Sequence, residues 1–140
     1  MKSCVVDASA ICSAFFQEEH AAAAQRLLAS DCNLHAPELI IAEVASVIWK
    51  RVTRDEIDAD EATALLADFR QLPLQITPSD GLIESALAIA LETGRTVYDS
   101  LYLALAIDRE CRLVTVDKRL INALTDTPLS KHVCHITKLR

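Results

Sequence analysis

The segment "TVYDSLYLALAIDRECRLVTVDKRL", residues 96–120, contains a helical pattern that is followed at once by a strand pattern. Its first part has apolar residues at helical spacing, and "RLVTV" (112–116) is a short run rich in β-branched residues, typical of a buried strand. Asp99 lies where the helix is expected to start, and Asp117 follows the strand. Two acids therefore bracket an apolar passage, and this raises the question of whether other acids join them.

The rest of the chain repeats this alternation of strands and helices. Strands alternating with helices predict βαβ units, a mainly parallel central sheet and helices on both of its faces, which is an α/β fold. The expected strands are 3–7, 33–37, 74–77, 112–116 and one near 133–137, and the expected helices are 8–16, 18–30, 38–52, 58–72, 79–94, the one in the opening segment, and 118–124.

Length and composition fit one domain over residues 1–140. The chain is 51% hydrophobic, which is ample for one core. No apolar run approaches the roughly 18–20 residues that span a bilayer. Asp7 interrupts the N-terminal apolar segment, so we expect no signal peptide, no membrane association and a cytoplasmic location.

Cysteine and glycine usage excludes several kinds of site. Five cysteines without a Cys-x-x-Cys pair predict reduced, mostly buried thiols. "HVCH" (132–135) is better explained by alternation along a strand than by metal binding. The two glycines, Gly81 and Gly94, are too few for a glycine-rich phosphate loop, a dinucleotide fingerprint or a G-x-S-x-G elbow.

Three aspartates stand at positions where ligands bind in parallel sheets. Such sheets bind ligands beyond the carboxyl ends of their strands, where the strand order reverses. If the strands that end near Asp7 and Asp117 are neighbours there, both carboxylates enter one crevice. A simpler explanation exists for Asp7, Asp99 and Asp117, because Asp is also a common helix N-cap. Asp80 has the same local setting and no functional indication.

Glu43 lies in the middle of an apolar helix, where a glutamate is unusual. Buried glutamates are generally paired or bound, and no basic residue stands three or four positions from Glu43. Either it faces solvent along a polar stripe with Ser46 and Lys50, or it faces a cation.

Together the four acids suggest a hard-cation site. Carboxylates that converge on one cleft repel one another unless a cation lies among them, and oxygen ligands without His or Cys suit Mg²⁺ or Mn²⁺. A cation held in this way suits phosphoryl chemistry. The formal charge of −6 argues against broad nonspecific nucleic-acid binding, but acids that hold cations contribute to that total.

Hydroxyl and basic residues near the acids have less specific indications. Thr115 and Ser9 lie two residues from Asp117 and Asp7. For Thr115 this spacing places a hydroxyl near the carboxylates, where it can orient a ligand or water, although β-propensity alone also explains this residue. Flanking basic residues are able to steer a phosphate chain, or are simply solvated loop charges: Arg95, Lys118 and Arg119.

With these acids identified, the chain resembles the PIN-domain ribonucleases, and most of all the VapC-type toxins of toxin–antitoxin pairs. The matching segments are "VVDAS", "APELIIAEVASVIWK", "TVYDSLYLALA" and "LVTVDKRL", in the family's order and near its spacing. The resemblance implies an endoribonuclease whose pocket binds Mg²⁺ or Mn²⁺ through Asp7, Glu43, Asp99 and Asp117, with Asp7 and Asp99 as the most direct ligands. It also implies 5′-phosphate and 3′-hydroxyl products, a homodimer and a cognate antitoxin.

Other α/β enzymes fit the sequence less well. A haloacid-dehalogenase-type phosphatase needs a second acid two residues after the first, where this chain has Ser9. A response-regulator receiver domain needs paired acids after the first strand and an isolated late lysine, and neither is evident. A non-catalytic PIN-like module that binds RNA or protein stays open.

The helix over residues 38–52 has more apolar surface than a lone surface helix needs. Either it is central in the core, or part of it, Trp49 especially, contacts a second copy or an antitoxin.

Overall fold

Five strands form one sheet in the computed structural model, which describes residues 2–139. They are β1 (Ser3–Val6), β2 (Asn33–Pro37), β3 (Leu74–Thr77), β4 (Arg112–Thr115) and β5 (Val133–His135), in the order β3-β2-β1-β4-β5. All neighbouring pairs within these strands are parallel. The predicted α/β fold is confirmed, and the described sheet is entirely parallel. The ends of the predicted domain, residues 1 and 140, lie outside the described residues.

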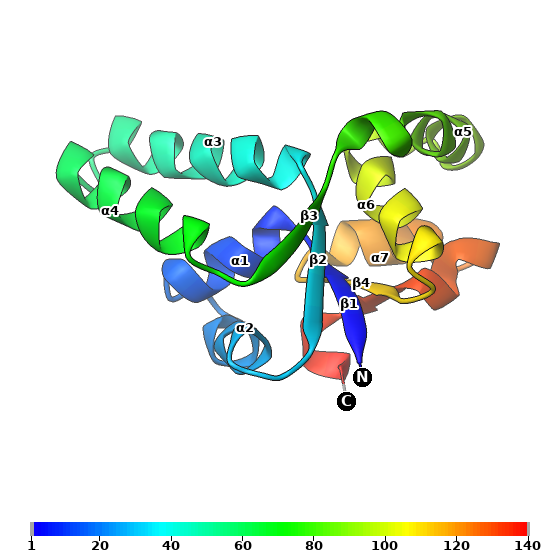
Figure 1. The fold of residues 1–140 in the computed structure, drawn as a ribbon, viewed down its shortest axis with the longest axis horizontal. Coiled ribbons are helices and arrows are strands. Elements are labelled where there is room, and N and C mark those ends of the chain that lie inside the picture. The colour runs from blue at the N-terminus through cyan, green and yellow to red at the C-terminus, as the bar shows by residue number, and fades with distance from the viewer. Residues whose placement is uncertain (1, 140) are drawn as a thin grey trace.

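Seven α-helices in residues 2–139 surround the sheet. Figure 1 shows α1 to α4 on one side of it and α5 and α6 on the other. The helices are α1 (Ala8–Phe15), α2 (Ala21–Leu28), α3 (Leu39–Thr53), α4 (Ala59–Arg70), α5 (Ile83–Thr93), α6 (Val97–Asp108) and α7 (Lys118–Leu124), with 3₁₀ turns η1 (Ser79–Gly81), η2 (Pro128–His132) and η3 (Ile136–Lys138).

The opening segment supplies the centre of the core. Seven consecutive residues of α6, Ser100 to Ala106, are buried, which explains why this helix is apolar on nearly all sides. The adjoining β4 buries Leu113 and Val114 completely. A helix and strand buried on every side fix the position of the acids attached to their ends.

The start of α6 differs from the sequence prediction. Thr96, not Asp99, is the N-cap, and its Oγ1 accepts a hydrogen bond from the backbone N–H of Asp99 at 3.0 Å. Asp99 therefore lies in the first helical turn, and its carboxylate is not used for capping. Thr96 takes the N-cap position in place of Asp99 because a Thr three residues before an acid has the spacing of a capping motif.

The preceding helix is interrupted at its start. Residues 79–94 were predicted as one helix, but Asp80 lies in η1 and α5 begins at Ile83. The predicted end at Gly94 is confirmed, because this residue has φ of +75°, a left-handed conformation that glycine adopts without strain.

The sheet places the two strand-end aspartates side by side. β1 pairs with β4, and the sheet order extends from this pair in both directions. Asp7 follows β1 directly and Asp117 lies two residues after β4, so the predicted crevice is at this strand reversal. Among residues 2–139, no helix is long and apolar enough to cross a membrane.

Candidate active site

Asp7 is a buried carboxylate with only polar partners. Its Oδ1 accepts hydrogen bonds from the Ser9 hydroxyl at 2.7 Å and from the Ala10 N–H at 3.0 Å, the latter capping α1. Its Oδ2 accepts the Thr115 hydroxyl at 2.5 Å. The side chain is 9% exposed, and no ion pair to it is formed within residues 2–139. Capping of α1 therefore accounts for only one of the three hydrogen bonds that the Asp7 carboxylate accepts.

Thr115 joins the ends of β1 and β4. Its Oγ1 donates to Asp7 and accepts the backbone N–H of Asp117 at 3.0 Å, while the Ser9 hydroxyl lies 3.3 Å away. The Asp117 carboxylate caps α7 through the N–H groups of Arg119 and Leu120. The predicted supporting role of Thr115 has this geometry, which β-propensity alone does not require.

Glu43 points toward α6. The hydroxyl of Tyr102 donates to Glu43 Oε1 at 2.5 Å, and the carboxylate is half-buried. Ser46 and Lys50, the other members of the solvent-facing stripe considered above, are both exposed. Glu43 therefore departs from that stripe and turns toward Tyr102 of α6.

Asp99 is the acid with a cationic neighbour. Arg95 Nη2 lies 3.1 Å from Asp99 Oδ2, and both side chains are partly exposed. Arg95 Nε is buried and has no hydrogen-bond partner among the described residues. The guanidinium thus occupies one oxygen of Asp99 and holds positive charge next to this carboxylate.

Electrostatic coupling shows that the four acids are close in space. Burial raises the pKa of Asp7, hydrogen bonds from Thr115, Ser9 and Ala10 lower it, and the charge of Asp117 raises it further. Burial likewise raises the pKa of Glu43, the Tyr102 hydroxyl lowers it, and the charges of Asp7 and Asp99 add to the rise. The acids therefore form one connected region of negative charge at the carboxyl edge of the sheet.

The donor set matches a hard divalent cation in chemical kind. All four groups are carboxylates, and the buried Asp7 has no positive partner. As the described side chains are placed, no three His, Cys, Asp or Glu groups form a ready cluster. Repulsion between like charges explains this, because Glu43 and Asp99 turn instead to Tyr102 and Arg95.

Sequence reasoning missed Tyr102. It lies three residues after Asp99, about one helical turn along α6. Only 3% of the residue is exposed, and its hydroxyl orients Glu43. The signal was present in "YDSLYLA", where a tyrosine follows the acid on the same helix face. Recognising its role also required knowing that α6 faces α3.

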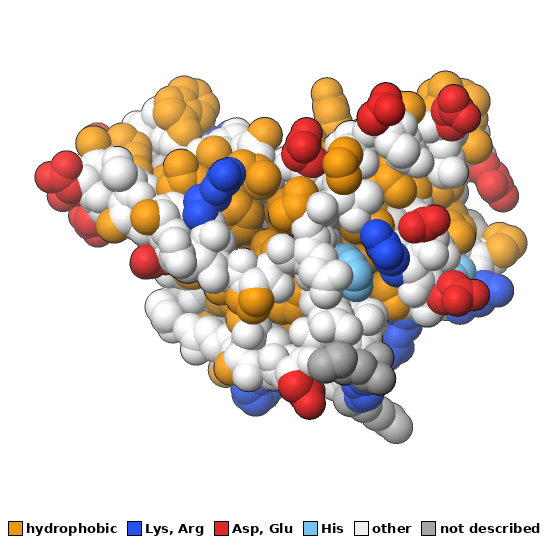
Figure 2. All heavy atoms as spheres, viewed as in Figure 1, with side chains coloured by type: hydrophobic (Ala, Val, Ile, Leu, Met, Phe, Trp, Pro, Cys, Tyr) orange, Lys and Arg blue, Asp and Glu red, His pale blue; other side chains and the backbone are white. Residues whose placement is uncertain are grey.

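The surroundings of the site carry mixed charge. Arg95, Lys118 and Arg119 flank the acids as predicted, and Arg95 contacts Asp99 directly. On the face drawn in Figure 2, acidic, basic and apolar side chains are interspersed, and no single broad basic surface is seen.

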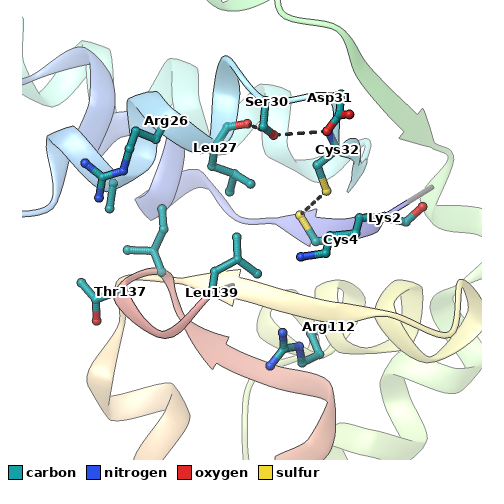
Figure 3. A pocket seen from close by; sticks show the side chains of 13 residues that line it. Lys2, Cys4, Arg26, Leu27, Ser30, Asp31, Cys32, Arg112, Thr137 and Leu139 are labelled. Atoms are coloured by element: carbon teal, nitrogen blue, oxygen red, sulfur yellow. Dashed lines mark hydrogen bonds between the residues drawn. The ribbon is translucent and has the colours of Figure 1, made fainter.

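A cavity of about 450 Å³ lies at the opposite edge of the sheet. Figure 3 shows Cys4, Cys32, Arg26 and Arg112 around it, with the Cys4 and Cys32 sulfurs 3.7 Å apart. It adjoins the amino ends of β1 and β4, whereas the acids lie beyond their carboxyl ends. This cavity is therefore separate from the candidate active site.

The apolar residues of α3 divide between core and surface. Ile40, Val44 and Ile48 are buried, as the core explanation requires, while Trp49 is 62% exposed. The predicted contact through Trp49 stays a prediction.

Comparisons with known proteins agree with this arrangement. The model of the PIN domain matches residues 4–124. Ribonuclease VapC3 of Pyrobaculum aerophilum is 36% identical over 118 residues, which cover 83% of this chain and 90% of that protein.

Two solved structures share the fold. PAE2754 from Pyrobaculum aerophilum superposes with a TM-score of 0.71 at 23% identity, covering 98% of this chain and 85% of that one. VapBC2 from Rickettsia felis, bound to a DNA fragment from its promoter, superposes with a TM-score of 0.67 at 15% identity. The match covers 95% of this chain and 98% of that one. From the matched domain and the identity to VapC3, this chain belongs to the PIN domain family and, within it, to the VapC ribonucleases of toxin–antitoxin systems.

Proposed function

We propose that this protein is a Mg²⁺- or Mn²⁺-dependent endoribonuclease and the toxin of a toxin–antitoxin pair, acting in the cytoplasm. The observation that carries the proposal is the buried, unpaired carboxylate of Asp7, whose pKa is raised by burial and by Asp117, in a region shared with Glu43 and Asp99. Such a concentration of buried carboxylates favours a bound cation, and carboxylates with perturbed pKa values are typical of functional sites.

Each acid has a distinct part in the proposed site. Asp7 and Asp99 would hold the cation most directly, and Glu43 and Asp117 would complete the pocket. When bound, the cation would lower the pKa of an attacking water and stabilise charge on the phosphate. Thr115 fixes the orientation of Asp7, and Tyr102 fixes that of Glu43. Hydrolysis is proposed to leave a 5′-phosphate and a 3′-hydroxyl.

The test is cleavage of total cellular RNA by the purified protein, followed by mapping of new 5′ ends. We expect discrete cuts with Mg²⁺ or Mn²⁺ and none with EDTA. Added metal is also expected to raise the melting temperature, because it binds the folded state preferentially. Cleavage at full rate in EDTA would exclude the proposed chemistry.

A non-catalytic PIN-like module that binds RNA or protein is the alternative. It predicts RNA binding without new 5′ ends under all metal conditions. The intact set of four carboxylates, each with an orienting hydrogen bond or ion pair, favours the enzyme.

The proposed partners are an RNA substrate, a cognate antitoxin and a second copy of the chain. A toxin–antitoxin complex from Klebsiella pneumoniae has the same fold, with a TM-score of 0.64 at 17% identity. Co-expression with the neighbouring reading frame should yield a stable complex whose formation suppresses RNA cleavage.

A further inference from the structure

A smaller pocket adjoins α7, the helix that follows Asp117, and is not used by the site described above. It has a volume of about 290 Å³ and is lined by His20, Lys118, Ile121, His135, Thr137 and Lys138. Lys118 directly follows Asp117 in sequence. His135 ends β5 and is in register with Thr115 of β4, the residue that donates to Asp7. The pocket therefore lies at β5, the strand next to β4, which carries Thr115.

The protonation of His135 follows from its hydrogen bonds. The backbone N–H of Thr137 donates to His135 Nδ1 at 3.2 Å, and a backbone N–H is always a donor. Nδ1 must therefore be the unprotonated nitrogen, so the proton of the neutral ring is on Nε2. His135 Nε2 is a buried donor without a hydrogen-bond partner among residues 2–139, in a residue that is only 9% exposed.

Positive groups gather around this donor. The His20 ring packs edge-on against the His135 ring, with 4.6 Å between ring centroids. Burial lowers the pKa of His135, and the nearby His20 and Lys118 lower it further. Glu19 raises it, and Lys138 has a lesser lowering effect. The Glu19 carboxylate is itself directed to the solvent side, 3.8 Å from His20 Nε2 and 82% exposed. The residues that line the pocket thus include histidines and lysines and no acid.

An unsatisfied buried N–H beside two ammonium groups favours an anionic acceptor. Leaving such a donor unpaired costs on the order of 1–3 kcal/mol, which a bound oxygen would recover. A metal ion is disfavoured, because Nε2 carries the proton and the lysines repel a cation.

We propose that this pocket binds a backbone phosphate of the RNA strand next to the phosphate that is cleaved, with His135 Nε2, Lys118 and Lys138 as its donors. This deepens the proposed ribonuclease function and rests on it. Because Thr115 and His135 are paired residues on adjacent parallel strands, their side chains share one face of the sheet. The neighbouring phosphate would then fix the strand across the acids.

The first arm of the test is direct binding of inorganic phosphate to the full-length protein, followed by NMR of labelled histidine rings. We expect saturable shifts of the His135 ring, with little change at His35, which is buried in β2. Absence of a saturable shift at His135 would overturn the proposal.

The second arm measures binding of a short labelled RNA by fluorescence anisotropy in EDTA, where the proposed cleavage is absent. Lys138→Gln should weaken RNA binding roughly five- to tenfold and lessen the log–log salt slope by about 0.7. Lys131→Gln, the same change in η2 away from the pocket, is the matched control and should bind like the parent. Lys138 is exposed, so its substitution leaves the core intact.

The two arms separate this proposal from the proposed function. Phosphate binding without any effect of Lys138→Gln on RNA would overturn the assignment to the RNA strand. Weakened RNA binding by Lys138→Gln in a protein that never cleaves RNA would support the pocket and contradict the nuclease.

Discussion

Asp7 has two roles in the structure, because one carboxylate both caps α1 and receives two hydroxyl hydrogen bonds in the crevice. Asn caps a helix about as well as Asp, so replacing Asp7 by Asn separates the charge from the cap. This makes a single substitution informative about both roles.

Asp7→Asn is expected to lose RNA cleavage by more than roughly 100-fold, since groups that only support a metal ligand are already worth 10- to 100-fold. In EDTA its melting temperature should be equal to or higher than that of the parent, because a buried, repelled charge has been removed. Cleavage assays and thermal melts with and without Mn²⁺ check both expectations.

Asp80→Asn is the matched control. Asp80 lies exposed in η1, outside the cleft, and its substitution should change neither quantity. Parental cleavage by Asp7→Asn would remove Asp7 from the site.

His35 provides a pH-dependent contribution to stability that is independent of the acids. Burial lowers its pKa in the folded state, and the charge of Arg109 adds to this effect. The unfolded chain therefore binds more protons below about pH 6.5, and the folded state loses stability as pH falls through this range. Between pH 7.5 and 5.5 we expect the melting temperature of the parent to fall more than that of His35→Leu. Equal losses in the two proteins would contradict a buried neutral imidazole.

At the scale of single elements, α6 shows how capping and function divide between neighbouring residues. Thr96 caps the helix and thereby fixes the backbone of Asp99, leaving its carboxylate available to Arg95. The position of this acid thus depends on a residue that contacts no ligand in the proposed site.

Thr96→Ala should lower the free energy of unfolding by about 1 kcal/mol, the usual value of an N-cap hydroxyl. It should also weaken metal binding, because the first turn that holds Asp99 becomes less ordered. Thr96→Ser retains the hydroxyl and should behave like the parent in both. Denaturant unfolding and metal titration are the measurements. Metal affinity that is unchanged in Thr96→Ala would separate the cap from the site.

The same elements show what could be predicted from the sequence. The buried run of α6 and β4 and the turn at Gly94 are encoded by local patterns, and the fold followed from their alternation. The orientation of Glu43 toward Tyr102 was not predictable, because it depends on how α3 faces α6 across the sheet. The location of the ring proton of His135 on Nε2, where it has no acceptor among the described residues, depends on the turn at Thr137. This turn has no sequence signature.

At the scale of the molecule, three exposed apolar side chains form a stripe along α5. Ile83, Leu87 and Leu91 lie at successive four-residue intervals along α5 and are 43%, 51% and 79% exposed. A stripe of this kind suits an isologous contact with the same stripe of a second copy.

We expect the protein to sediment as a dimer and the pair Leu87→Glu and Leu91→Glu to sediment as a monomer, because charges would meet across the two-fold axis. Trp49→Lys tests whether α3 belongs to the same contact or to that with the antitoxin. A parent protein that stays monomeric at every concentration would contradict the predicted homodimer.

The pairing of β1 with β4 also constrains when this protein becomes competent during its synthesis. Thr115 bonds to Asp7 across 108 positions, and the helix that bears Asp99 emerges only shortly before it. The N-terminal part of a chain leaves the ribosome first, so Asp7 and Glu43 emerge long before Tyr102 and Thr115, which contact them. The nascent chain consequently cannot bring these four acids together until Asp117 has left the ribosome. The proposed RNA-cleaving site thereby stays unassembled while all of the preceding residues are made on an RNA-based machine.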